Sequence, residues 1–228
     1  MKQSKRFLSL LLCLLLIAAL GACGKKQAEP APAESVAPAE SAAPSESAEP
    51  TEEAAAPVRQ DGEEFESVIM LEGMEETIRL RHIVNETAGF EMDFEYESFV
   101  RSSEPDRERF VWSYDDPANP ENYLEVSFNP EDAETVAAAI NESLSEEYDV
   151  FWETRELDGA GKCIHLDASA VKGGNETADV LQAVYIIPAA DGCRVAALRY
   201  IPEGSDGFGK RLANMVNTIL VTEAKAVS

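Results

Sequence analysis

The sequence predicts an α+β fold: a single antiparallel β-sheet packed against two main helices, following a disordered tether. Apolar and polar residues alternate through most of residues 62–222, which is typical of half-buried antiparallel strands. Two segments within that range have helical periodicity instead. Residues 27–57, in contrast, contain no aromatic and no basic side chain, so we expect no core there.

Residues 1–22 have the pattern of an export signal. Lys2, Lys5 and Arg6 form a basic head, and an apolar run from Phe7 to Leu20 follows it. At about 1.5 Å per helical residue this run is about 21 Å long, short of the roughly 30 Å hydrocarbon core of a bilayer. We therefore expect a cleaved signal peptide and not a transmembrane anchor.

The segment Leu20-Gly21-Ala22-Cys23 resembles the lipobox of bacterial lipoproteins. The resemblance implies that the signal is cut before Cys23, whose thiol then carries a diacylglycerol. Each buried methylene contributes about 0.8 kcal/mol, so two or three acyl chains hold a domain on a membrane where one does not. We expect a location on the extracytoplasmic face of the cell membrane. The alternative is an ordinary secreted protein with a chance cysteine at the cut.

The charge balance limits the partners of this chain. It has 19 basic and 43 acidic residues, and residues 1–22 carry three of the bases and no acid, so the mature chain has a net charge of −27. Such a chain repels phosphate groups and anionic lipid headgroups. We expect no nucleic-acid partner, and contact with the membrane only through the lipid anchor.

A tether and a short tail flank the predicted domain. Residues 23–61 form the tether, in which the stretch 27–57 contains 11 alanine, seven glutamate, six proline and four serine residues. Proline and like charges extend such a chain to a reach of roughly 95 Å, at about 3.1 Å per residue. The domain occupies residues 62–222, enough for one core, and residues 223–228 form a C-terminal tail.

Alternating patterns predict nine strands in the domain. The most regular is GFEMDFEYE, in which the apolar side chains of Phe90–Tyr96 share one face and the acidic side chains share the other. Lys172–Asn175 and Asp191-Gly192 have the composition of hairpin turns, so we expect the last three strands to form a meander. The other expected strands are Phe65–Leu71, Thr77–Val84, Arg109–Tyr114, Tyr123–Phe128, Val150–Glu156, Lys162–Val171, Val180–Ile187 and Arg194–Ile201.

Two helices interrupt these strands. Residues 129–144 begin with Asn129 as the expected N-cap and Pro130 in the first turn, followed by acidic residues that the helix dipole favours there. The second helix is expected to start near Ser205 and to bury an apolar stripe that includes Leu212 and Val216.

The order of these elements resembles the PsbP-like family, whose domain is shared with a Ran-binding nuclear-transport factor and with bacterial lipoproteins. The resemblance covers about Phe90 to Thr222. It rests on GFEMDFEYESF at the start, the strand–helix–strand passage from Asn129 to Glu156, and hairpins that close with a helix. Members of that family are mostly binding or assembly proteins, so the resemblance implies interaction and not catalysis. It supplies no functional residue.

One segment fits the glycine-rich phosphate-binding loop, with Gly204, Gly209 and Lys210 at the required spacing. However, Arg211 stands where a serine or threonine would ligate magnesium, and Asp206 places a negative charge where phosphate would lie. The preceding strand also belongs to an antiparallel meander, whereas the motif requires a parallel strand–loop–helix unit. We interpret the segment as a turn into the second helix.

Cys163, His165 and Asp167 alternate, so they share one face of their strand. A thiol, an imidazole and a carboxylate are groups that bind zinc or form a Cys–His nucleophile. We favour a polar sheet face with a hydrogen-bonded histidine, because residues two apart on a strand seldom converge on one small ion. We predict no catalytic residue and no cofactor.

A disulfide between Cys163 and Cys193 is one of two states that the sequence leaves open. These cysteines remain after Cys13 is removed with the signal and Cys23 is lipidated. Export to an oxidising compartment permits the bond. In a regular meander, however, one strand separates the two by about 9.6 Å, beyond the roughly 7 Å limit for a disulfide. The bond requires splayed strand ends or another strand order.

The loop YDDPANPENY gathers Asp115, Asp116, Asn119 and Glu121. Such oxygen ligands suit calcium, but their spacing matches no EF-hand and the loop lacks the EF-hand glycine. We prefer a solvated acidic turn and keep these four residues as weak metal candidates.

These observations favour a membrane-anchored, non-enzymatic binding or assembly module with a protein partner in the cell envelope. The first alternative is a binder of a small molecule, calcium or zinc that uses the acidic loop or the Cys–His–Asp face. The second is a hydrolase whose site no motif reveals.

Overall fold

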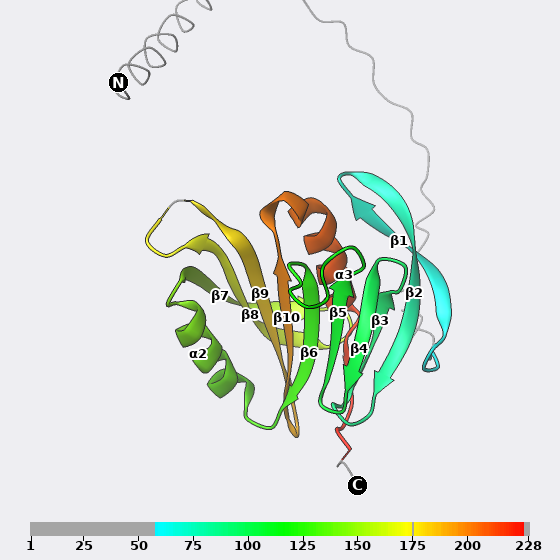
Figure 1. Ribbon diagram of the computed structural model, residues 1–228. Helices are drawn as coiled ribbons and strands as arrows, with labels where there is room; N and C mark the ends of the chain where they lie inside the picture. Colours follow the sequence, from blue (N-terminus) through cyan, green and yellow to red (C-terminus); the bar gives the residue numbers. More distant parts are fainter. Residues whose placement is uncertain (1–57, 175, 226–228) are drawn as a thin grey trace, which may run out of the picture. The chain divides into compact units, whose positions relative to one another are not determined.

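The computed structural model describes residues 58–174 and 176–225 (Figure 1). Their strands are β1 (Glu64–Leu71), β2 (Met74–Asn85), β3 (Phe90–Glu95), β4 (Phe99–Glu104), β5 (Arg107–Trp112), β6 (Tyr123–Asn129), β7 (Tyr148–Leu157), β8 (Gly161–Val171), β9 (Thr177–Ala189), β10 (Gly192–Tyr200) and β11 (Leu220–Val221). Their α-helices are α2 (Ala133–Leu144) and α3 (Lys210–Asn217). The predicted signal peptide, Cys23 and residues 24–57 of the tether lie outside the described residues.

The strands form two antiparallel sheets, so the prediction of a single sheet is wrong. One sheet has the order β1-β2-β3-β11 and the other the order β4-β5-β6-β10-β9-β8-β7. The division falls between β3 and β4, where the chain turns and the Ser98 N–H donates to the Glu95 carbonyl. Alternation identifies a strand, but it does not specify which neighbours that strand pairs with.

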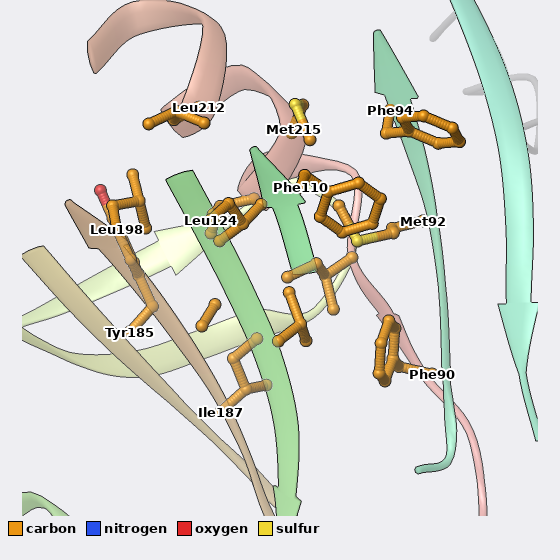
Figure 2. Packing of buried hydrophobic residues seen from close by; sticks show 14 of the residues in the cluster. Phe90, Met92, Phe94, Phe110, Leu124, Tyr185, Ile187, Leu198, Leu212 and Met215 are labelled. Carbon is orange, nitrogen blue, oxygen red and sulfur yellow. The ribbon is translucent and has the colours of Figure 1, made fainter. Parts of the chain in front are cut away.

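The main core lies between the two sheets (Figure 2). Phe94 of β3 packs on Phe110 of β5, with ring centroids 5.0 Å apart. Leu212 and Met215 of α3 close the same cluster at one end. Each large apolar side chain buried here stabilises the fold by about 1.5–3 kcal/mol before entropy is counted, so this cluster is the main source of stability.

A second core lies on the opposite face of the larger sheet, beneath α2. Val136 and Ala137 of the helix pack in one cluster with Leu166 of β8 and Ile186 of β9. The larger sheet is therefore covered on both faces: by α2 on one side, and by the smaller sheet with α3 on the other.

The N-cap of α2 is Asp132, and the prediction of Asn129 is wrong. The Asp132 side chain accepts a hydrogen bond from the Thr135 N–H at 2.9 Å. Asn129 instead ends β6, and its side chain accepts from the Glu131 N–H at 2.9 Å. Both residue types suit caps, so composition alone did not separate them.

The second helix starts later than expected. A 3₁₀ turn (Pro202–Gly204) and a π-helical turn (Ser205–Gly209) come first, and α3 begins at Lys210. Strand β10, which precedes these turns, is antiparallel to both of its neighbours. This topology agrees with a turn and not with a phosphate-binding loop.

Helix α3, which packs into the main core, also reaches the acidic side chains of the smaller sheet. Arg211, near its start, forms ion pairs with Glu95 of β3 and Glu76 of β2. Asp93 and Glu95 are buried, although alternation places them on a solvent-facing side. The prediction that β3 is half-exposed is therefore wrong, because the sequence gives no sign that α3 packs there.

The last three long strands form the predicted meander. Strand β8 pairs with β9 and β9 pairs with β10, each antiparallel.

Among the described residues no helix has both the length and the apolar character that a bilayer crossing requires.

Candidate functional site

The acidic loop between β5 and β6 uses its oxygens to hold its own backbone. Asp115 accepts hydrogen bonds from the N–H groups of Glu121 (2.9 Å) and Asn122 (2.6 Å). Asp116 accepts from the N–H two residues on, and its carbonyl accepts from the Asn119 N–H. Over residues 58–174 and 176–225, no group of three or more His, Cys, Asp or Glu residues is arranged to hold a metal ion.

Strand β8 places Cys163, His165 and Asp167 on one face, as their alternation predicts. His165 is almost fully buried, with its ring centroid 4.5 Å from that of Tyr185. Burial lowers the pKa of His165 and raises the pKa of Cys163. Both groups are therefore neutral near pH 7, which disfavours a thiolate nucleophile. His165 Nδ1 lies 3.3 Å from Glu153 Oε1, but neither ring nitrogen makes a hydrogen bond among the described residues, so the expectation of a hydrogen-bonded histidine is wrong.

Cys163 and Cys193 are both buried, free thiols. Cys163 belongs to the core between the sheets, whereas Cys193 belongs to the core beneath α2. Their side chains lie on opposite faces of the larger sheet, so the disulfide considered from the sequence does not form. Burial also raises the pKa of Cys193 to about 11.

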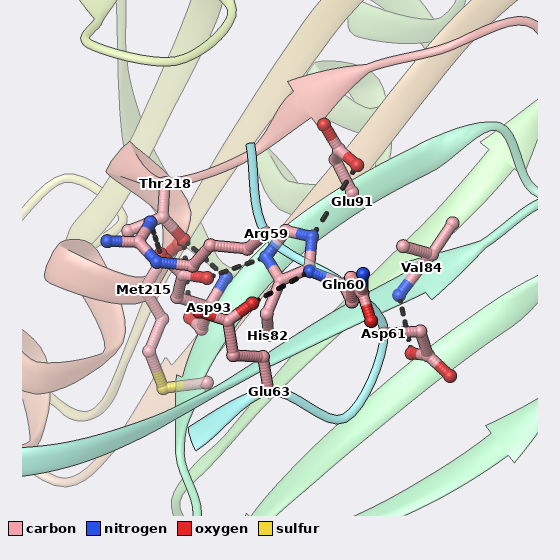
Figure 3. Close-up of polar contacts among 10 residues, drawn as sticks. All are labelled: Arg59, Gln60, Asp61, Glu63, His82, Val84, Glu91, Asp93, Met215 and Thr218. Atoms are coloured by element: carbon pink, nitrogen blue, oxygen red, sulfur yellow. Dashed lines mark hydrogen bonds and ion pairs between the residues drawn. The ribbon is translucent and has the colours of Figure 1, made fainter. Parts of the chain in front are cut away.

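A buried polar cluster surrounds His82 of β2, which no sequence motif indicates (Figure 3). His82 is paired in register with Asp93 of β3, and its Nδ1 lies 2.8 Å from Asp93 Oδ1. An ionised carboxylate can only accept, so the proton of this hydrogen bond lies on Nδ1. His82 is 5% exposed and Asp93 is 7% exposed, which shields the bond from water.

Asp93 is fixed by two further contacts. The guanidinium of Arg59 lies 3.3 Å from Asp93 Oδ2 and 3.8 Å above the ring centroid of Phe65. The Asp93 backbone N–H donates to the Thr218 hydroxyl at 2.9 Å. A carboxylate held in this way sets the tautomer and the orientation of its histidine partner.

A pocket of about 380 Å³ lies beside this cluster. Gly159 in the β7–β8 turn shapes it: a Cβ there would lie 2.4 Å from the Ile219 carbonyl oxygen, so only glycine permits this approach. The Gly159 N–H donates to the Asn217 carbonyl at 3.0 Å. We call this cavity the His82 pocket, and it is lined by Val58, Arg59, His82, Glu91, Asp93, Asp158, Gly159, Asn214, Asn217, Thr218 and Leu220.

The Nε2 atom of His82 has no hydrogen-bond partner among the described residues. The Glu91 carboxylate lies 3.5 Å away. In the neutral ring with its proton on Nδ1, Nε2 is an acceptor and faces the Glu91 acceptor, whereas in the protonated ring Nε2–H is directed at Glu91. In the neutral ring this buried acceptor costs about 1–3 kcal/mol unless it is paired, so Nε2 is a group that a donor can satisfy.

The His–Asp pair resembles part of a hydrolytic triad, yet the pocket does not complete one. Thr218 supplies the one hydroxyl among the lining residues, and it donates to the Met215 carbonyl at 2.7 Å. Nucleophilic catalysis requires a hydroxyl or thiol within hydrogen-bond reach of the histidine.

The His82–Asp93 pair could have been predicted from the sequence, because a hairpin places the two residues opposite each other. Asn85 and Phe90 flank the turn between β2 and β3 as a registered pair, and the same register aligns His82 with Asp93. Recognition of that hairpin would have paired the two residues. Arg59 and Thr218 come from distant segments, and nothing in the sequence links them to β3.

Comparison with known proteins gives distant similarities. No family model and no curated protein matches the chain. The solution structure of cyanobacterial PsbP (CyanoP) from Synechocystis sp. PCC 6803 is 12% identical, with 62% of this chain and 92% of that chain covered and a TM-score of 0.43. A crystal structure from Bacteroides thetaiotaomicron VPI-5482 is 10% identical, with 62% of this chain and 48% of that chain covered and a TM-score of 0.39. The chain thus spans about half of the second protein, and neither likeness carries an argument about function.

Proposed function

We propose that this chain is a lipid-anchored extracytoplasmic protein whose folded domain is a non-enzymatic binding module, with the His82 pocket as its binding site. The lipobox-like segment that ends at Cys23 supports the anchor. The proline-rich, acidic tether supports a domain that works at a distance from the bilayer.

The observation that carries this proposal is the unpartnered Nε2 of His82. It is a buried polar atom that lines a formed cavity, while its ring is held in place by Asp93. Preformed cavities of about 300–1,000 Å³ with a few convergent polar groups are the usual form of small-ligand sites. The volume and the lining of the His82 pocket fit that description.

A protein partner is the second candidate, and the edge of the larger sheet favours it. Strand β7 lies at that edge, where Phe151 and Trp152 remain 62% and 43% exposed. An edge strand offers unpaired backbone groups to which another chain adds a strand. Such a partner corresponds to the envelope protein expected from the sequence.

Photo-crosslinking in intact cells tests the proposal. A photoreactive amino acid replaces Asn214 in the pocket of the full-length lipoprotein, and in the control it replaces exposed Glu142 on α2. We expect position 214, and not position 142, to yield one reproducible adduct by mass spectrometry. Equal labelling at both positions, or none at either, would contradict the pocket. A third variant carries the photoreactive amino acid at Trp152 on β7, and a protein captured through that position alone would favour the second candidate.

A further inference from the structure

We propose that the His82 pocket binds a small organic cation whose primary ammonium group lies between Nε2 of His82 and the carboxylate of Glu91. This inference rests on the proposed binding function and adds the chemical class of the ligand. It follows from the hydrogen-bonding capacity, the charge and the shape of the pocket.

Nε2 of the neutral His82 ring and the Glu91 carboxylate are two hydrogen-bond acceptors that can share one donor. In the neutral ring the Asp93 carboxylate accepts the Nδ1 proton of His82, which leaves an Nε2 lone pair facing Glu91 Oε2, 3.5 Å away. An ammonium group carries three N–H donors and no acceptor. One such group donates to Nε2 and to Glu91 together, and it satisfies the buried imidazole nitrogen.

The charges that face the pocket also favour a cation. Arg59 supplies a positive charge, but its guanidinium is paired with Asp93. Glu91 from β3 and Asp158 from the β7–β8 turn then leave the cavity negative. A bound ammonium is stabilised by both carboxylates, and an anionic ligand is repelled by them.

An ammonium group fits these side chains better than a metal ion. Protein-bound zinc takes four ligands and calcium takes six to eight, held close to the ion. In the described part of the chain His82 and Glu91 are not joined by a third residue placed to complete such a set. A cation that carries its own N–H donors needs no such shell.

The rest of the lining suits a short aliphatic chain attached to the ammonium. Val58 and Leu220 contribute apolar surface beside the polar cluster. Asn214 and Asn217 contribute amide groups that both donate and accept. A small amino alcohol combines an ammonium, a few methylenes and a hydroxyl that match these three parts.

Nitrogen NMR of the histidine rings tests this inference, because the whole chain has just two histidines. Full-length lipoprotein labelled with ¹⁵N-histidine, in detergent micelles, is titrated with 4-amino-1-butanol and, separately, with 1,4-butanediol and succinate. The two rings are assigned with a His165→Asn variant. We expect a saturable shift of His82 Nε2 with the amine, half complete at or below about 1 mM, and no shift of His165.

Matched variants locate the contact. Glu91→Gln should weaken amine binding roughly 10- to 100-fold, since it removes a charge-assisted hydrogen bond. Glu142→Gln, the same change on exposed α2, should leave the affinity unchanged. Unchanged affinity in Glu91→Gln overturns the inference, as does saturation of His82 by zinc.

The outcomes separate the ligand class from the binding function. A stronger response of His82 to the diol or to succinate overturns the ammonium ligand and leaves the binding module in place. If His82 responds to no probe but position 214 gives an adduct in cells, the ammonium ligand is likewise overturned and the binding module stays in place. No response and no adduct overturn both proposals.

Discussion

At the scale of single residues, Asp93 and Glu91 touch the same histidine but have different roles. Asp93 is buried and bonded to His82, with Arg59 on its other oxygen. The Glu91 side chain is 29% exposed and faces the open pocket. The first carboxylate therefore positions the site, and the second is available to a ligand.

Asp93→Ala should lower the free energy of unfolding by about 2–3 kcal/mol, because it leaves the buried Nδ1–H of His82 and the Arg59 guanidinium without their acceptor. Glu91→Gln should change it by less than about 0.5 kcal/mol. Urea denaturation of the purified protein measures both values. Equal losses in the two variants would contradict the division of roles.

The cysteines give a second prediction at this scale. Burial holds the pKa values of Cys163 and Cys193 above their usual range, so alkylation of the folded protein should be slow. After unfolding without reductant, we expect two reactive thiols per mature chain, because the proposed processing removes Cys13 with the signal and places a lipid on Cys23. Three thiols would contradict the lipid anchor, and none would indicate a disulfide.

At the scale of elements, the start of α2 depends on one side chain. The Asp132 carboxylate caps the helix through the Thr135 N–H, and these hydrogen bonds lower its pKa. Asp132→Ala removes this cap and should therefore reduce stability in a denaturant titration near pH 7. The control is Ser143→Ala, at an exposed position of the same helix. A loss of similar size there would rule out a specific capping effect.

The sequence was sufficient for elements whose pattern is local. The turn at Asp191-Gly192 predicted the β9–β10 hairpin, and a run of apolar residues with an acidic first turn predicted α2. The sequence did not show that β3 and β4 join different sheets, because the pairing of β3 with β11 involves residues more than 120 positions apart. Long-range pairing leaves no periodic signal in a single sequence.

The same limit explains why the site was only partly predictable. His82 and Asp93 are hairpin neighbours, but Asp93 looks solvent-facing because it alternates with apolar residues. Its burial depends on α3 and Arg59, which lie far away along the chain. The acidic loop was the more visible candidate, and the carboxylates of Asp115 and Asp116 prove to be bonded within the loop.

At the scale of the whole molecule, Arg194 joins segments from both sheets. It is fully buried, donates to the Gly89 and Thr222 carbonyls, and pairs with Asp191. Gly89 has a φ of +68°, and a Cβ there would lie 2.2 Å from the Arg194 guanidinium. This cluster connects the β2–β3 turn, the β9–β10 turn and the C-terminal segment.

The cluster should make stability sensitive to acid. The hydrogen bonds from Arg194 lower the pKa of Asp191 from 3.8 to about 2. A lowered carboxyl pKa gives stability that is complete above the unfolded pKa and is lost as pH falls, here between about pH 4 and pH 2. We expect a contribution of at most about 2 kcal/mol.

Thermal or urea unfolding across that pH range measures the effect. The Asp191→Asn variant should lack this part of the acid dependence while it keeps the dependence caused by other carboxyl groups. If wild type and Asp191→Asn lose stability identically as pH falls, the pKa of Asp191 is not lowered in the folded protein.

Native mass spectrometry of the lipoprotein, released gently from its membrane, tests the central claim most directly. The claim is that a lipid-anchored chain binds a ligand in the His82 pocket. We predict a mature chain that begins at a lipidated Cys23 and carries one small-molecule adduct, which persists in Glu142→Gln and is lost in Glu91→Gln. A wild-type chain without an adduct, or an adduct unaffected by Glu91→Gln, would contradict the account.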